Sequence, residues 1–150
     1  MSNKVCTAWF NGDGLRDAVV KACVDPMDKA AMLVEAEVKK SMKSGGGAKH
    51  RPSPPGTPPH VQSGHLRASI TWARIHNGLN RIIGPQRSVA WYGAIHEFGL
   101  MVKNKLGGVT HFPMRPFMWP ALLRCRHKFA PLFRGLNIKR YYRDNRGRLR

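Results

Sequence analysis

Apolar and polar residues alternate near the middle of the chain, and this alternation predicts the first elements. Leu66, Ala68 and Ile70 are each followed by a polar residue, which is the period of a strand with one buried face. An Asn-Gly pair follows at residues 77–78, and both residue types tolerate the positive φ of a type I′ turn. The sequence therefore predicts an antiparallel hairpin over residues 66–83.

A second pair of apolar segments lies further along, at residues 100–102 and 109–112. They bracket the basic, glycine-containing loop of residues 103–108, which indicates a second hairpin with a mobile tip. Just before it, the apolar residues of segment 92–98 fall on one side of a short helix, and Gly99 is suited to end that helix.

The N-terminal third has helical spacing instead. Leu15, Val19 and Ala22 recur at helical intervals, and Asp13 is a plausible N-cap. These features predict a first helix that stops near Val24.

A second helix is predicted over residues 25–43. Asp25 and Pro26 supply a cap and a proline at the first helical position, and lysines crowd the last turn before Gly45. Its apolar stripe is Met27, Ala31, Val34, Val38 and Met42. Ordinary core packing is the interpretation that we favour for this stripe, and a groove for a partner is the alternative.

Prolines shape the rest of the chain. Five of the eight residues at 52–59 are proline, so this run can be neither helix nor central strand and should be an extended arm, within residues 45–62. Pro120 suits the first position of a C-terminal helix, which Pro131 should kink or shorten.

These elements predict an α+β fold. We expect a small antiparallel sheet from the two hairpins, packed by the long helix of the N-terminal half and by the C-terminal helix. Residues 5–10 are a further candidate strand. The chain is short enough for one domain, over residues 1–134, followed by a basic extension at 135–150.

Charge changes the picture most. The chain has 26 Lys and Arg against 8 Asp and Glu, a net charge of +18, and half of it lies in residues 124–150. Such a chain attracts polyanions, nucleic acid first, although a basic tail also suits an acidic partner protein or a subunit interface. The residues that we expect to face nucleic acid are Lys139, Arg140, Arg143, Arg146, Arg148 and Arg150.

The sequence contains few of the residue patterns that are typical of enzymes. Three cysteines at wide spacing favour free thiols over a disulfide framework or a zinc site, and His96-Glu97 lacks the second histidine of a zincin. The expected partner of Glu97 is a nearby arginine, Arg67 or Arg115. No nucleophile elbow, dinucleotide loop, apolar membrane span or signal peptide is evident. We expect no catalysis, metal or cofactor.

Three segments carry a resemblance to a known family. They read PPGTPPHVQSGHLRASI at residues 54–70, YGAIHEFG at 92–99 and FPMRPFMWPAL at 112–122. In this order and spacing they resemble the tail-component family of long-tailed double-stranded DNA phages. Members of that family are small proteins of the neck, where the DNA-filled head meets the tail.

The resemblance implies a structural role in the virion after synthesis in the bacterial cytoplasm. It implies a ring, most often a hexamer, that completes the neck as a head-tail connector and surrounds the genomic DNA. The implied partners are other copies, other neck proteins and tail tube or terminator proteins, with no membrane. The alternatives are a tail terminator that caps the tube and, outside virions, a sequence-nonspecific DNA-binding protein.

We expect contacts with neighbours from the proline-rich arm, the basic loop of the second hairpin and the three segments. The expected contact residues are Pro54, Pro55, Gly56, Pro58, Pro59, His60, Leu66, Arg67, Tyr92, His96, Glu97, Phe98, Gly99, Arg115, Pro116 and Phe117.

Overall fold

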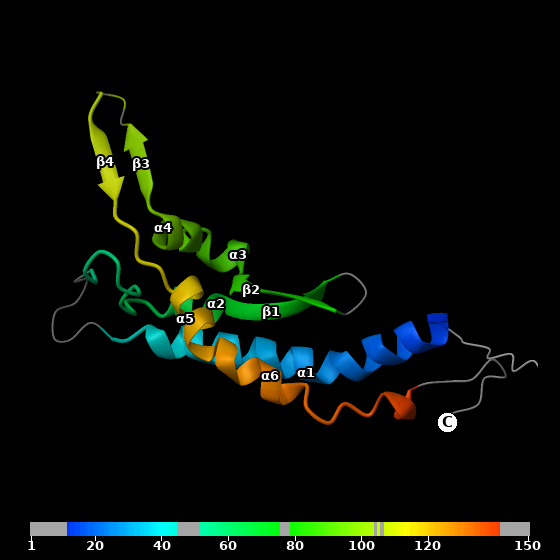
Figure 1. Ribbon diagram of the computed structural model, residues 1–150. Helices are drawn as coiled ribbons and strands as arrows, with labels where there is room; N and C mark the ends of the chain where they lie inside the picture. The colour runs from blue at the N-terminus through cyan, green and yellow to red at the C-terminus, as the bar shows by residue number, and fades with distance from the viewer. Residues whose placement is uncertain (1–11, 45–51, 76–78, 104, 106, 142–150) are drawn as a thin grey trace, which may run out of the picture.

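The structure is a computed structural model that describes residues 12–44, 52–75, 79–103, 105 and 107–141 (Figure 1). Its helices are α1 (Gly12–Ser41), α2 (His65–Ser69), α3 (Arg87–Ala90), α4 (Gly93–Phe98), α5 (Met118–Cys125) and α6 (Phe129–Leu132), with 3₁₀ turns η1 (Arg126–Lys128) and η2 (Ile138–Arg140). Its strands are β1 (Ile70–Ile75), β2 (Asn80–Pro85), β3 (Leu100–Lys103) and β4 (Val109–Phe112). The expected strand at 5–10, the linker at 45–49, the turn at 76–78 and the tail beyond 141 lie outside the described residues.

The fold is α+β, as the sequence predicts. A long helix occupies the N-terminal half, antiparallel strands follow, and a helix lies near the C-terminal end. The strands form two separate two-stranded sheets, β1-β2 and β3-β4. Only the first of them packs on α1, because β3-β4 points away from that helix (Figure 1).

The two helices expected before residue 44 are one helix, and the predicted break at Asp25 is wrong. Pro26 lies inside α1 and is buried. Proline has no backbone N–H, so this position cannot donate the hydrogen bond that a residue inside a helix normally makes. Ala18, Ala22 and Pro26 nevertheless continue the buried stripe of the second half of α1, so packing along one face outweighs the local cost of the proline.

The first hairpin is confirmed, with one change at its start. β1 and β2 pair antiparallel from Ile70 opposite Pro85 to Ile75 opposite Asn80. The segment before β1, expected as strand, is the short helix α2, which follows Gly64 at a positive φ of 84°. Leu66 and Ile70 are both buried, which satisfies helical spacing as well as alternation, so the pattern alone did not separate the two.

The core lies where α1, α2, α3, β1 and α5 meet. It consists of Val34, Val38, Met42, Leu66, Ile70, Ala90, Phe117, Ala121 and Cys125. Phe117 is 1% exposed and is among the largest fully buried side chains. Burial of such a side chain contributes about 1.5–3 kcal/mol, so the segment before α5 is anchored to the rest of the chain.

The C-terminal helix is divided. α5 begins at Met118, two residues before Pro120, and η1 separates it from α6. The ring of Pro131 clashes with the carbonyl of the residue four positions earlier in a regular helix, and that residue, His127, lies in η1. Beyond α6, η2 lies against α1, so the chain returns along the long helix (Figure 1).

Candidate functional site

The three segments of the family resemblance come together in space. Gly56 N donates to Met114 O at 2.8 Å, which joins the proline-rich arm to the third segment. Arg115 Nε donates to Ser53 O at 2.8 Å, and Arg115 N donates to His96 O at 2.6 Å. Arg115 therefore ties the arm and α4 to the segment that leads into α5.

Glu97 has a structural role that the sequence did not predict. Its Oε2 accepts hydrogen bonds from the backbone N–H groups of Phe117 and Met118 at 2.8 and 3.0 Å. Its Oε1 accepts one from Trp119 N at 3.1 Å. The expected pairing with an arginine is wrong, because the carboxylate instead satisfies the unpaired N–H groups that every helix N-terminus presents.

The proline-rich arm is a folded loop. Thr57 bonds through both its N–H and its hydroxyl to Pro54 O, and Val61 N donates to Lys43 O at 2.9 Å beyond the end of α1. Pro54, Pro55 and Gly56 are exposed. This exposed turn is the part of the arm that is available to a neighbour.

The other expected contact residues divide by burial. Pro59, Leu66 and Phe117 are buried within the chain. Those that are partly buried are Pro58, His60, Tyr92, His96, Glu97, Gly99, Arg115 and Pro116. Arg67 and Phe98 are exposed, and Phe98 at 75% is the more notable because it is a large apolar ring in water.

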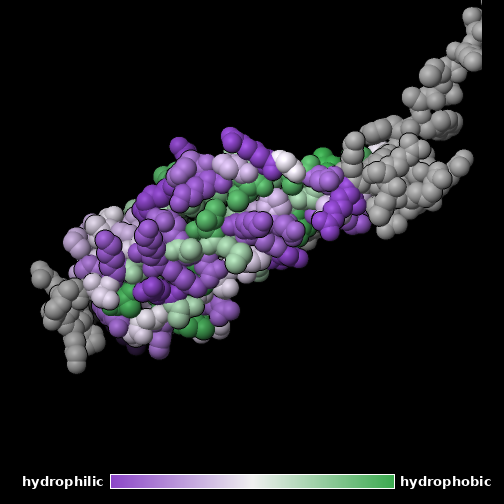
Figure 2. Space-filling model, turned by 90° about the horizontal axis from the view of Figure 1, so that it is seen from below, coloured by the Kyte–Doolittle hydropathy of each residue, from purple (hydrophilic) through white to green (hydrophobic). Residues whose placement is uncertain are grey.

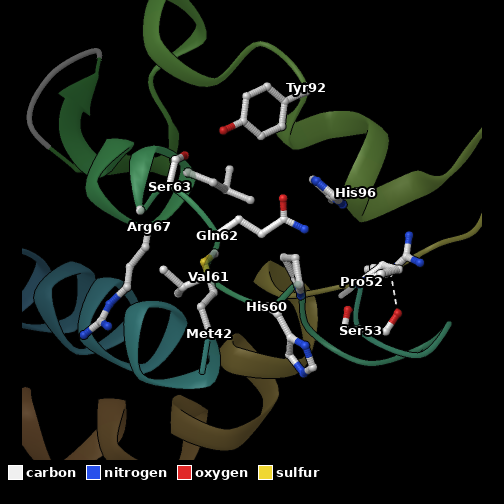
Figure 3. Close-up of a pocket in the computed structure, with 14 residues that line it drawn as sticks. Met42, Pro52, Ser53, His60, Val61, Gln62, Ser63, Arg67, Tyr92 and His96 are labelled. Atoms are coloured by element: carbon white, nitrogen blue, oxygen red, sulfur yellow. Dashed lines mark hydrogen bonds between the residues drawn. The ribbon is translucent and has the colours of Figure 1, made fainter. Parts of the chain in front are cut away.

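A polar cavity of about 210 Å³ lies between the arm, α2 and α4. Figure 3 shows the amide of Gln62 directed toward His96, with Tyr92 beside them and the guanidinium of Arg67 directed away from them. The rings of Tyr92 and His96 meet edge to face, with centroids 5.8 Å apart. Burial, and then the charge of Arg115, lowers the pKa of His96 below its ordinary value of 6.5, which favours the neutral imidazole.

An apolar groove of about 640 Å³ lies on another side, between β2, α4 and α5. Ile82, Phe98 and Trp119 line it and are 57%, 75% and 61% exposed. The two charged residues in its lining already have partners, because Arg81 bonds to Asp28 and Glu97 bonds to the start of α5. The groove therefore presents an apolar surface without a free charge.

The β3-β4 hairpin is the most exposed regular element, since all eight of its residues are exposed. Directly opposed residues point to the same side of a hairpin. The register places Leu100 and Val102 with Phe112 and Thr110 on one face. The other face holds Met101, Lys103, Val109 and His111.

One hairpin face is thus uncharged and the other is apolar with a basic component. Met101 is 71% and Val109 60% exposed. Sequence reasoning predicted this hairpin but missed its apolar faces and the groove. The sequence held no signal for them, because apolar strands that are exposed and apolar strands that are buried have the same pattern.

Basic residues gather near the C-terminal end. Arg126, Lys128, Arg134 and Arg140 are exposed, and the face that is seen from below is largely hydrophilic (Figure 2). Arg140 is the one expected nucleic-acid contact whose side chain is described, since Arg143, Arg146, Arg148 and Arg150 lie outside the described residues. For Lys139 only the backbone, within η2, is placed.

The described residues contain no group of three His, Cys, Asp or Glu side chains placed to hold a metal ion. Within the same residues, no helix is long and apolar enough to cross a membrane. Comparisons with protein-family models, curated proteins and solved structures find no match for this chain.

Proposed function

We propose that this chain is a structural subunit of the neck of a long-tailed phage. In this proposal it forms a ring around the genomic DNA and joins the filled head to the tail, in contact with other neck proteins and with the tail tube or its terminator. The resemblance of three sequence segments suggests the location. The observation that carries the proposal is the exposed β3-β4 hairpin.

A two-stranded hairpin without packing partners is marginally stable in water. Leu100, Met101 and Val109 place apolar area in solvent on both of its faces. Exposed apolar surface of this kind marks a site of protein-protein contact. A subunit that acts through assembly needs such a surface, whereas an enzyme of this size would need convergent ionisable groups.

The occupant that we propose for the apolar groove is the uncharged face of the hairpin from a neighbouring copy. A chain with a net charge of +18 repels its own copies, so their contact must be made by surfaces without free charge. The face of Leu100, Val102 and Phe112 and the groove at Ile82 and Trp119 meet this condition. Contact between two different surfaces of one subunit closes into a ring when the rotation allows.

The experiment compares Val102→Asp with Val89→Asp, the same substitution at a residue of α3 outside both surfaces. Val102 is 41% and Val89 46% exposed, so neither change should alter the unfolding temperature by more than a few degrees. We expect Val102→Asp, supplied in place of the natural chain, to abolish joining of heads to tails, and Val89→Asp to support it. Full joining with Val102→Asp would refute the proposed role of the hairpin.

Nonspecific binding of double-stranded DNA is a second candidate, because exposed basic residues such as Arg126, Lys128 and Arg134 lie close together in sequence. Binding of this kind loses orders of magnitude in affinity between low and moderate salt. Contacts between the chain and its protein neighbours should largely persist over that range, which separates the two functions in one titration.

A further inference from the structure

The apolar groove runs along the edge of β2 that is not paired with β1. Every residue from 81 to 85 lines the groove, whereas a strand that presented only one face to it would contribute alternate residues. Ile83 packs against the core and Ile82 is 57% exposed, so these neighbours point to opposite faces of the sheet. Because both line the groove, its wall on this side is the edge of the strand.

The hydrogen bonds of the first hairpin show which backbone groups of β2 face that edge. Gln86 N donates to Ser69 O at 2.9 Å, and Pro85, the residue before it, has no N–H to donate. Bonded and non-bonded pairs alternate along an antiparallel ladder. Ile83, two positions before Pro85 and opposite Trp72, is therefore at a non-bonded position, and its N–H and C=O are directed away from β1.

The groove side of β2 is an open strand edge. Among the described residues, none bonds to the N–H or the C=O of Ile83 on that side, and β1-β2 is a two-stranded sheet. The strand carries neither a lysine nor a bulge that would keep another strand away, and Arg81 is paired with Asp28. An edge of this kind accepts an extended segment as a further strand.

β4 of a neighbouring copy is the segment whose chemistry fits this edge. β4 contains no Lys, Arg, Asp or Glu, whereas β3 ends at Lys103, and a chain with a net charge of +18 repels a basic strand. Val109, Thr110 and Phe112 of β4 are the β-branched and aromatic types that pack well beside another strand. The β3-β4 hairpin points away from the β1-β2 sheet of its own chain (Figure 1), which leaves the β2 edge to a hairpin from another copy.

We propose that β4 of one subunit pairs with β2 of the next through main-chain hydrogen bonds. The N–H and C=O of Ile83 bond to the added strand, and the two hairpins form one sheet in the order β1-β2-β4-β3. The apolar side chains at Phe98 and Trp119 then pack on the added hairpin. This inference rests on the proposed function for the identity of the neighbour, and it adds that backbone pairing, in addition to side-chain contact, holds the hairpin in the groove.

The test is the substitution Ile83→Pro, with Ile83→Val as the matched control. Proline removes the outward N–H, whereas valine keeps it. Neither change removes a hydrogen bond between β1 and β2, and Pro85 already occupies an equivalent position in the same strand. Each variant is supplied to phage that lack the natural chain. We expect Ile83→Val to join heads to tails as the natural chain does, and Ile83→Pro to lower the number of joined particles about tenfold or more.

The unfolding temperatures of the two variants show whether both fold. A second measurement, on the natural chain, gives an answer even if Ile83→Pro does not fold. An isotope-labelled chain is titrated with a synthetic peptide of residues 108–113 with blocked ends, and NMR spectra follow the backbone amides. We expect a saturable shift of the Ile83 amide signal and slower exchange of its hydrogen, whereas the amide of Ile82, which already bonds to β1, keeps its exchange rate.

A second peptide, with methyl groups on the amide nitrogens of Val109 and Thr110, is the control for main-chain pairing. Two adjacent amides of a strand point to opposite edges, so one of the two methyl groups faces β2 whichever way the peptide lies. We expect this peptide not to bind.

The pairing is overturned if Ile83→Pro folds and joins heads to tails as well as Ile83→Val does. It is also overturned if the first peptide leaves the Ile83 amide unshifted, or if the methylated peptide binds equally well. Failure of the pairing is distinct from failure of the proposed function. If Val102→Asp abolishes joining while a folded Ile83→Pro supports it, the hairpin still acts in the neck but docks through side chains alone.

Discussion

At the scale of single residues, Glu97 explains why α4 and α5 keep a fixed relation. One carboxylate accepts three backbone hydrogen bonds from the start of α5. Hydrogen bonds to a charged acceptor are stronger than those to a neutral one. The side chain thus acts as a helix cap supplied from a distant part of the sequence.

Replacement of Glu97 by glutamine tests this cap. Glu97→Gln keeps the shape but removes the charge and one acceptor oxygen, so we expect the free energy of unfolding to fall by about 1–2 kcal/mol in chemical denaturation. Glu35→Gln is the control, since Glu35 forms only an i,i+4 pair with Lys39. That change should cost about 0.5 kcal/mol or less, and equal losses in the two variants would contradict the cap.

His96 predicts a pH dependence of stability. Burial, and then Arg115, lowers the pKa of His96 in the folded chain below 6.5. As the pH falls through 6.5, the unfolded chain therefore takes up a proton that the folded chain resists, and folding is progressively penalised.

The expected result is a free energy of unfolding that decreases from pH 7 to pH 5. His96→Gln removes the titrating group, so its unfolding free energy should decrease less over the same interval in parallel denaturation curves. If the natural chain and the variant follow the same slope, His96 does not have the lowered pKa that its environment implies.

The partner of Glu97 could not be predicted from sequence. Arg67 and Arg115 were reasonable candidates by charge. In the structure, however, Arg115 donates to Ser53 O and Arg67 is exposed. The cap depends on where α5 begins relative to α4, which is set by tertiary packing. The sequence also predicted that α5 begins at Pro120. With that start, the N–H groups of Phe117, Met118 and Trp119 did not stand out as donors for the Glu97 carboxylate.

At the scale of elements, Asp28 fastens the first hairpin to the long helix. It bonds to Arg74 of β1 and, at 2.6 Å, to Arg81 of β2. The hydrogen bond from Arg74 is the main cause that lowers the pKa of Asp28 below its ordinary value of 3.8, despite the opposing effect of burial. The Arg81 side chain is 3% exposed, so this ion pair is largely shielded from water.

Asp28→Asn should lower the free energy of unfolding by about 3 kcal/mol, because it removes the charge from a carboxylate that pairs with an almost fully buried guanidinium. Arg74→Gln is the control on the exposed side of the same carboxylate, and its loss should be much smaller because water screens that pair. Thermal denaturation measures both. If Asp28→Asn loses no more stability than Arg74→Gln, the ion pair between Asp28 and Arg81 does not hold the hairpin to α1.

Gly93 permits the close approach of α4 to β2 and α2. A Cβ at this position would lie 2.6 Å from Pro85 Cγ and 3.3 Å from Leu66 Cδ1. Gly93→Ala should therefore reduce the free energy of unfolding by about 1–2 kcal/mol, although alanine favours helix. At Gly84 a Cβ meets nothing within 4 Å, so Gly84→Ala should change stability by less than about 0.5 kcal/mol. Equal losses of stability in the two variants would contradict a tight contact at Gly93.

Element types were predictable where local pattern and packing agree. Both hairpins and the helix ending at Gly99, whose φ is 72°, follow from turn residues and alternation. The start of a second helix at Asp25-Pro26 was not correct, because the stripe through Ala22 and Pro26 continues into that of Val34. The continuous buried face of α1 therefore outweighed the local signal for a helix start at Asp25-Pro26.

At the scale of the whole molecule, two separate properties define what the chain can do. Its basic residues give it attraction for polyanions, and its hairpin and groove give it uncharged apolar surfaces for protein contact. Composition predicted the first property. The apolar surfaces could not be predicted from the sequence, because apolar strands that are buried in the core and apolar strands that are exposed for a partner have the same pattern.

These properties suit a subunit that contacts copies of itself on one side and DNA on another. We propose that such contacts let the chain complete the junction between a DNA-filled head and a tail. Mass in solution is a poor test, since such a subunit can stay monomeric until it meets its partner.

The most direct measurement is electron microscopy of a lysate from phage that carry a nonsense mutation in the gene for this chain. If the chain completes the neck, we expect DNA-filled heads beside separate tails of normal length, with joining restored when the chain is supplied. Tails of uncontrolled length would identify a tail terminator instead, and intact infectious particles would contradict any role for the chain in the neck.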